Sequence, residues 1–274
     1  MTEGSERDYV LGTHEEEVAR LGLQHRVWRS RALECWRRSG ITVGSRVLDV
    51  GAGPGYATVD LAEIVGPTGE VVAIERSGRF ARTAQEACRL RGLKNVQVLE
   101  MDLMQESPKV SGMDAAWCRW VASFVASPER LVSTIASALR IGGVAAFHEY
   151  VDYRTWRLAP QGPALESFVG EVMASWRASG GEPDIGLALP RLLNDAGMRV
   201  RHLSPIVFVV SPGDFEWQWP KAFVEVNLRR LEELKRADAA WADALRQEFR
   251  NAEKDPASVM ITPLVLEIIA ERVA

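Results

Sequence analysis

The sequence predicts an α/β fold in which helices cover both faces of a mostly parallel sheet. Between residues 45 and 150, short segments that are apolar on both faces alternate with segments of helical periodicity. Strands buried on both faces have this composition, and helical crossovers connect parallel strands. A glycine-rich turn, "GAGPG" at 51–55, follows the first apolar segment and opens a helix. A turn in this position directs backbone N–H groups and a positive helix end at a ligand.

The alternation can be followed element by element up to residue 150. Two of the expected helices end at glycines, Gly66 and Gly92, which are common stop residues. Strands are expected at 46–50, 70–75, 96–101, 113–118 and 143–150. Helices are expected at 55–65, 78–91 and about 128–140.

The regular alternation ends after residue 150. Residues 152–183 are expected to form a mostly helical insertion between "LAPQGP" and "SGGEP". A helix at 185–197 and a long strand within 199–210 follow, and a second helical insertion covers about 214–256. The final segment, "PLVLEIIAERV", suits a helix or a strand. Its β-branched residues favour a last strand that closes the sheet.

These patterns predict three parts. Residues 1–43 form an N-terminal helical cap, 44–211 a ligand-binding core that contains the 152–183 insertion, and 212–274 an insertion plus final strand that serve as a substrate lid. Apolar residues recur at helical spacing through the cap, with arginines on the other side. We interpret these arginines as a solvated helix face rather than a basic binding patch: Arg26, Arg29, Arg31, Arg37 and Arg38.

The composition is that of a soluble globular protein of 274 residues, with 47% hydrophobic and 26% charged residues. A net charge of −4 argues against a general nucleic-acid binder, which needs a basic face. Three scattered cysteines are too few for a disulfide framework or a zinc site, so no metal is expected. The N-terminus lacks the apolar core of a signal peptide, and no apolar run could span a bilayer. The sequence therefore predicts a cytoplasmic protein.

The glycine turn differs from the common nucleotide-binding motifs. Gly51, Gly53 and Gly55 alternate with other residues, and Tyr56 stands where the third glycine of the dinucleotide fingerprint is expected. No Gly-Lys-Ser/Thr follows, which excludes a phosphate loop. Asp49, just before the turn, suits a ligand that carries positive charge rather than a pyrophosphate.

Two further acidic residues follow the next two strands. Glu75 can accept hydrogen bonds from both hydroxyls of a ribose and would repel a 2′-phosphate. Asp102, in "LEMDLM", can meet an adenine amino group. Taken singly, each is better explained as a helix N-cap or a solvated loop residue. Three acidic residues at the ends of three successive strands favour a nucleoside ligand with a positive charge.

At this point the chain resembles the class I S-adenosylmethionine-dependent methyltransferases. The matching segments are "VLDVGAGPG", "VVAIERS", "LEMDL" and "LVSTIASALRIGGVAAFHEY", within about 44–205. The segment "EVARLGLQHRVWR" (17–29) looks like the N-terminal cap helix of a bacterial small-molecule subgroup.

The resemblance implies a Rossmann-like seven-stranded sheet whose last strand is antiparallel. It also implies S-adenosylmethionine lying over the glycine turn, with its ribose on Glu75, its adenine near Asp102, and its methionine end near Gln24 and His25. The implied cofactor site further includes Arg76, Leu103 and Cys118, although Cys118 also suits a packing role.

The acceptor site is expected beyond the fourth and fifth strands, at the switch point of the sheet. His148 is the first candidate for a catalytic base because an ordinary histidine titrates near neutrality. If His148 points into the helix layer, Glu149 or Tyr150 takes that place. Arg119 could hold an anionic substrate group or pair on the surface. The expected substrate-binding residues are Arg119, Trp120, Tyr153 and Trp156.

Tryptophans are frequent in the two insertions and beside the acceptor site. They suit a lid over an apolar or aromatic substrate, or a core of the insertions themselves. The sequence "CRWV" after the fourth strand is not the Asn/Asp-Pro-Pro-aromatic tetrad of enzymes that methylate exocyclic amines. Neither a double-glutamate loop nor an acidic cluster for a Mg²⁺-dependent catechol enzyme is evident.

The sequence thus predicts methyl transfer by in-line displacement to a small organic acceptor, apolar or aromatic, of the kind found among secondary metabolites. An aminopropyl or other transferase with a cofactor of this type, a non-catalytic binder of S-adenosylmethionine, and a nicotinamide oxidoreductase remain alternatives. The expected partner is a small molecule, with no nucleic acid or membrane, and the chain is expected to be a monomer or homodimer.

Overall fold

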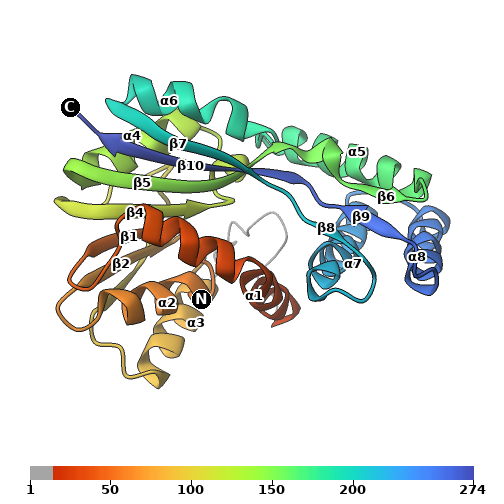
Figure 1. Cartoon of the computed structure of the whole chain (residues 1–274), viewed down its shortest axis with the longest axis horizontal. Coiled ribbons are helices and arrows are strands. Elements are labelled where there is room, and N and C mark those ends of the chain that lie inside the picture. The colour runs from red at the N-terminus through yellow and green to blue at the C-terminus, as the bar shows by residue number, and fades with distance from the viewer. Residues whose placement is uncertain (1–14) are drawn as a thin grey trace, which may run out of the picture.

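A seven-stranded sheet forms the core of the protein in the computed structural model, which describes residues 15–274. The strand order is β3-β2-β1-β4-β5-β10-β7. The first five strands pair in parallel, whereas β10 is antiparallel to both of its neighbours. The α/β class and the antiparallel last strand are therefore confirmed (Figure 1). The strands are β1 (Arg46–Val50), β2 (Glu70–Glu75), β3 (Val96–Glu100), β4 (Met113–Arg119), β5 (Leu139–Asp152), β7 (Met198–Ile206) and β10 (Leu264–Arg272).

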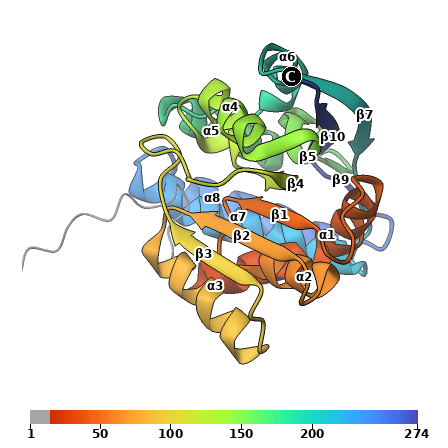
Figure 2. The same cartoon turned by 90° about the vertical axis from the view of Figure 1, so that its left-hand side faces the viewer.

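Helices cover both faces of this sheet (Figure 2). One apolar core lies between the sheet and the helices α1 (Glu15–Arg38) and α2 (Tyr56–Val65), with α3 (Gly78–Leu90) beside β3. On the other face, α4 (Pro128–Ala138) and α6 (Leu189–Asp195) bury leucines and isoleucines against the strands. Five of the six arginines of α1 are exposed, which agrees with a solvated face, whereas Arg20 is buried.

The two insertions pack together at one end of the sheet. Helix α5 (Pro163–Ala178) contacts α7 (Gln218–Glu233) and α8 (Ala239–Lys254). A second sheet of three short strands, β6-β9-β8, joins them to the core (Figure 1). Its strands are β6 (Arg157–Ala159), β8 (Val209–Val210) and β9 (Val259–Ile261). The division into cap, core and lid remains a prediction, and residues 1–14 of the cap lie outside the described part.

Several expected boundaries differ in the structure. The helix expected at 185–197 is a single 3₁₀ turn, Ile185–Leu187, followed by α6 with Pro190 in its first turn. Proline has no backbone N–H to bond to the carbonyl four residues earlier, and it is tolerated in the first turn of a helix, which explains why a new helix begins here. The strand expected within 199–210 ends at Ile206, and residues 209–210 join the small sheet instead. Strand β5 begins at Leu139, four residues earlier than expected.

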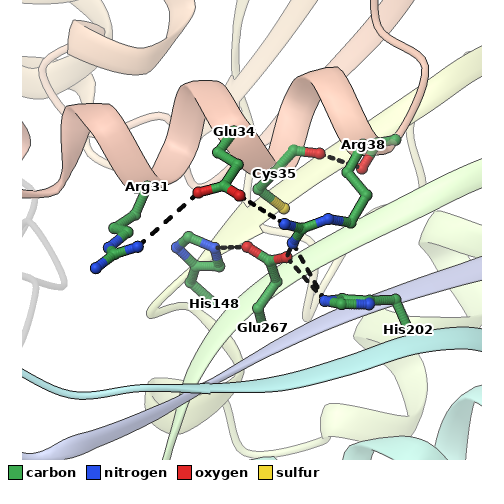
Figure 3. Close-up of polar contacts among 8 residues, drawn as sticks. Arg31, Glu34, Cys35, Arg38, His148, His202 and Glu267 are labelled. Carbon is green, nitrogen blue, oxygen red and sulfur yellow. Dashed lines mark hydrogen bonds and ion pairs between the residues drawn. The ribbon is translucent and has the colours of Figure 1, made fainter.

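A buried carboxylate anchors α1 to the sheet (Figure 3). Glu267 of β10 is 3% exposed and forms an ion pair with Arg38 of α1. It also contacts the Nε2 atoms of His148 at 3.1 Å and His202 at 3.3 Å. Burial works against its charge, but His148 and Arg38 outweigh burial and lower the pKa of Glu267. Its contribution to stability is therefore present above the ordinary glutamate pKa and is lost as the pH falls.

Replacing Glu267 with glutamine should lower the free energy of unfolding by about 2 kcal/mol, because the hydrogen bonds from His148 and Arg38 to this buried group lose their charged acceptor. Glu34→Gln is the matched control. Glu34 contacts the same Arg38 at 2.7 Å but is exposed, so a change below about 1 kcal/mol is expected. Urea unfolding at neutral pH measures both. If both variants lower the free energy of unfolding by the same small amount, packing alone holds α1 against the sheet.

Candidate functional site

A cavity of about 520 Å³ lies at the carboxyl ends of β1, β2 and β4. Helix α1 covers one side of it with Leu21, Gln24 and His25. This edge is where parallel α/β sheets bind ligands, and the volume lies in the range of small-molecule sites. Of the residues expected at the cofactor or substrate, these line the cavity: Gln24, Asp49, Gly51, Gly53, Glu75, Arg76, Asp102, Leu103, Arg119 and Trp120.

The glycine turn exposes bare backbone to this cavity. Gly51 has φ +66° and Gly53 has φ +56°, which are left-handed conformations that favour glycine. A Cβ on Gly51 would overlap the side chain of Val121, so this position admits no larger residue. A Cβ on Gly53 would meet no atom of residues 15–274 within 4 Å, and Gly53 lines the cavity. A ligand can therefore approach the backbone of the turn directly.

Glu75 fixes the glycine turn and still faces the cavity. Its Oε2 accepts a hydrogen bond from the backbone N–H of Gly53 at 2.9 Å, and its Oε1 accepts one from Ser77 at 2.8 Å. Burial is the main reason that the pKa of Glu75 is raised. A carboxylate can accept about four hydrogen bonds, so Glu75 retains acceptor capacity for a ligand hydroxyl. Asp102 is occupied locally, since it accepts from Met104 N at 2.9 Å and Gln105 Nε2 at 3.0 Å.

Asp49 is a buried acidic residue at the other end of the cavity. It is 2% exposed and accepts a hydrogen bond from Thr58 Oγ1 at 2.6 Å. Burial raises the pKa of Asp49 to about 6, against the opposing effects of the Thr58 bond and of the nearby Arg119. No ion pair reaches Asp49 within residues 15–274, so its charge is available to a cationic ligand.

Arg119 lies in the cavity wall rather than in a surface ion pair. Its Nη1 is buried without a hydrogen-bond partner among the described residues. Its Nη2 donates to His25 Nδ1 at 3.3 Å, and His25 Nε2 in turn donates to Asp60 Oδ2 at 3.0 Å. Burial lowers the pKa of Arg119 to about 10, and burial also lowers that of His25. Arg119 therefore remains a cation at neutral pH beside a neutral imidazole.

Asp60 is a contributor to the site that the sequence did not reveal. It lies on α2, where an acidic residue interrupts the apolar run "TVDLA". Arg29 of α1 also binds it, with Nε at 2.7 Å from Oδ2. An acidic residue inside a buried helix face is the one signal that could have singled it out.

Trp120 forms an aromatic wall of the cavity with a strained backbone. Its φ of +52° is rare for a bulky residue, and such strain is concentrated at functional sites. The indole lies between Tyr150 and Trp219, with ring centroids 5.6 and 5.9 Å away, and the Arg119 guanidinium lies 5.0 Å from its centroid. Trp120 is thus held at the wall by packing from the core and from α7.

His148, the expected base, lies outside the cavity. It is fully buried under α1, with Nε2 bonded to Glu267 and its ring 4.8 Å from that of Trp117 (Figure 3). Burial lowers the pKa of His148. The alternative in which it points into the helix layer is therefore the one that the structure shows. Catalysis by His148 is not supported by this position.

Glu149 and Tyr150 do not reach the cavity either. Glu149 is bonded to the turn after β4, and Tyr150 packs behind Trp120. Tyr153 and Trp156 are 1% exposed and belong to the aromatic core around α5 and α7. Gly55 packs against α3, and Cys118 is a buried packing residue. The tryptophans of the insertions thus fill their own core.

Cys35, His148 and Glu267 bring three potential metal ligands within 4.8 Å of one another, away from the cavity. Arg38 already neutralises Glu267. His148 Nδ1 has no partner among residues 15–274, whereas a metal-binding histidine normally donates its second ring N–H to a neighbour. These contacts favour a hydrogen-bonded network over a metal centre.

Comparison with known proteins gives a family for the core. A family model described as a methyltransferase domain matches residues 47–143. The chain is 34% identical over 101 residues to a protein-L-isoaspartate O-methyltransferase of Ignicoccus hospitalis, covering 37% of this chain and 45% of that protein. It is 35% identical over 82 residues to a demethylmenaquinone methyltransferase of Staphylococcus aureus, covering 30% and 32%. The chain thus spans less than half the length of these curated relatives.

Solved structures share the fold at low sequence identity. A phosphoethanolamine N-methyltransferase of Haemonchus contortus, solved with S-adenosylhomocysteine, has a TM-score of 0.57 at 16% identity, covering 92% of this chain and 56% of that one. The [4+2]-cyclase SpnF has a TM-score of 0.54 at 19% identity, covering 87% and 79%.

No helix within residues 15–274 is long and apolar enough to cross a membrane. The matched segment holds the glycine turn, Glu75, Asp102 and Arg119, the residues around which the cavity is built. Residues 47–143 match a methyltransferase domain, and the sheet that contains them has the fold that solved methyltransferases share.

Proposed function

We propose that this protein transfers the methyl group of S-adenosylmethionine to a small organic acceptor bound beside Trp120. One observation carries the proposal: a single cavity joins a bare glycine turn and Glu75 to a buried acid and to a guanidinium that has no acidic partner within residues 15–274. A nucleoside that ends in a zwitterionic amino acid is complementary to this arrangement. When bound, the cofactor supplies an electrophilic methyl group on a positively charged sulfur.

The residues present fit the cofactor at both of its ends. Glu75 retains acceptor capacity for the ribose hydroxyls, and Asp102 and Leu103 line the cavity wall at which we expect the adenine. At the other end Asp49 offers a carboxylate to the ammonium group. Arg119, oriented by the His25–Asp60 pair, offers its guanidinium to a carboxylate of the cofactor or of the acceptor.

The acceptor side of the cavity is apolar and aromatic. Trp120, Val121, Phe124 and Leu21 line it. These residues exclude water and align an acceptor, which is the main contribution of a protein to in-line displacement. The curated relatives are named for acceptors as different as a protein isoaspartate and demethylmenaquinone. The proposal of a small apolar acceptor is therefore supported by the apolar lining of the cavity and not by similarity to these relatives.

The proposed function is tested by incubating the protein with S-adenosylmethionine and a panel of phenols, amines, thiols and carboxylic acids. Release of S-adenosylhomocysteine that depends on one acceptor class is the expected result. Binding of S-adenosylhomocysteine without turnover on the panel would favour a non-catalytic binder or another reaction, as the cyclase SpnF illustrates for this fold. Binding of NAD instead would contradict the proposal.

Replacing Arg119 with methionine tests whether this residue binds the carboxylate of the cofactor or a carboxylate of the acceptor. If it holds the cofactor carboxylate, affinity for S-adenosylhomocysteine should fall about tenfold to a hundredfold, as expected for a charge-assisted hydrogen bond. Affinity for 5′-methylthioadenosine, which lacks the amino-acid end, should stay within about threefold. Calorimetry measures both. Unchanged affinity for both ligands would instead assign Arg119 to the acceptor.

The affinity for S-adenosylhomocysteine should also fall at acidic pH. Only ionised Asp49 attracts the ligand ammonium, and its pKa is about 6, so affinity should decrease as the pH drops below that value. One linked proton gives a slope of up to about tenfold per pH unit. Calorimetry between about pH 5 and about pH 8 measures the slope, and Asp49→Asn should flatten it. A slope that persists in Asp49→Asn would show that another group titrates.

A further inference from the structure

Three consecutive residues after β4 are bonded to one buried carboxylate. Glu149 Oε1 accepts hydrogen bonds from the backbone N–H groups of Val121 at 2.7 Å and Ala122 at 2.8 Å. Its Oε2 accepts one from Ser123 Oγ at 2.8 Å. Glu149 itself is fully buried and comes from β5, the neighbouring strand. The turn therefore owes its backbone hydrogen bonds to a side chain almost thirty residues away in sequence.

This turn forms part of the wall of the cavity. Val121 packs directly over Gly51 of the glycine turn, and both Val121 and Phe124 line the cavity. Trp120, which precedes the turn, is held at φ +52°. On its other side, the backbone oxygen of Ser123 accepts a hydrogen bond from Glu182 N at 3.0 Å. The turn thus joins the cofactor side, the acceptor side and the segment after α5.

The position of Glu149 is costly for the fold. No cation pairs with Glu149 among residues 15–274, and burial raises its pKa to about 7 despite the hydrogen bonds from residues 121–123. The group that faces it from β4 is Cys118, whose pKa Glu149 raises further after burial. A carboxylate buried without a cation destabilises the folded state relative to an apolar residue of similar size. Any stabilising effect of Glu149 must therefore come from its contacts with the turn after β4.

The local benefit is hydrogen-bond acceptance. The first N–H groups of the turn have no helix or strand to bond with, and a buried unpaired N–H costs about 1–3 kcal/mol. We propose that Glu149 is a positioning residue of the methyl-transfer site, which holds residues 121–123 so that Val121 closes over Gly51 and Trp120 and Phe124 form the acceptor wall. This inference rests on the proposed function.

The test compares Glu149→Gln with Glu149→Met. Glutamine keeps a carbonyl oxygen that accepts from both backbone N–H groups, and its amide can donate to Ser123 Oγ. Methionine has a similar length but offers only a weak acceptor. Affinity for S-adenosylhomocysteine should fall at least about tenfold in the methionine variant and stay within about threefold in the glutamine variant. Amide hydrogen exchange at Val121 and Ala122 should rise in the methionine variant alone.

A matched control comes from the lid. Glu248 of α8 also accepts two backbone N–H groups, from Ala164 and Leu165 at 2.9 Å, but it does not line the cavity. Glu248→Met therefore removes comparable hydrogen bonds and should leave the affinity for S-adenosylhomocysteine unchanged. If Glu149→Met does not fold, Ser123→Ala removes one of the three donors and should lower the affinity about threefold.

Three results would overturn the inference. The first is unchanged affinity in Glu149→Met, or in Ser123→Ala where that variant is used. The second is an equal loss in the glutamine variant, which would make charge rather than acceptance the cause. The third is an equal loss in Glu248→Met, which would show a general effect on the fold. If the unaltered protein does not bind S-adenosylhomocysteine, the proposed function itself fails, and that result is separate from these three.

Discussion

The position of α1 against the sheet is the constraint on which the cavity depends. Glu267 holds this helix from β10 through Arg38. Further along the same helix, Trp28 meets the rings of Trp120 and Trp219 at 5.1 Å. The helix then delivers Gln24 and His25 to the cavity wall. A shift of α1 would therefore change the core, the packing of α7 and the cavity together.

The pleat of β5 gives three adjacent residues three different surroundings. His148 faces α1, where it bonds to Glu267, and Tyr150, two residues on, packs behind Trp120. Glu149 points to the opposite face and reaches the turn after β4. Alternation by two is fixed for any strand, but which of the two sets faces a cavity depends on packing from other elements. The sequence predicts the alternation, but it does not predict which set of side chains faces the cavity.

The same distinction explains which parts of the fold were predictable. The parallel strands and the glycine turn follow from local patterns of apolar residues and glycines, and the structure confirms them. The small sheet does not, because β8 has two residues and β6 three, too short for any periodicity. At the site, Asp49 and Glu75 follow from strand ends, whereas Asp60 acts only through the contact of α1 with α2.

Buried charges follow two rules in this protein. Away from the cavity they are paired, as Glu17 with Arg20 at 2.6 Å and Glu267 with Arg38. Around the cavity, Asp49, Arg119 and Glu149 have no ion pair within residues 15–274. Burial shifts the pKa of each in the direction that favours its uncharged form. Unpaired buried charge lowers stability, so its concentration at one site indicates a function that compensates for it. For Asp49 and Arg119 we propose that a ligand of opposite charge provides this compensation. For Glu149 no ligand is needed, because the N–H groups of the cavity wall are its partners.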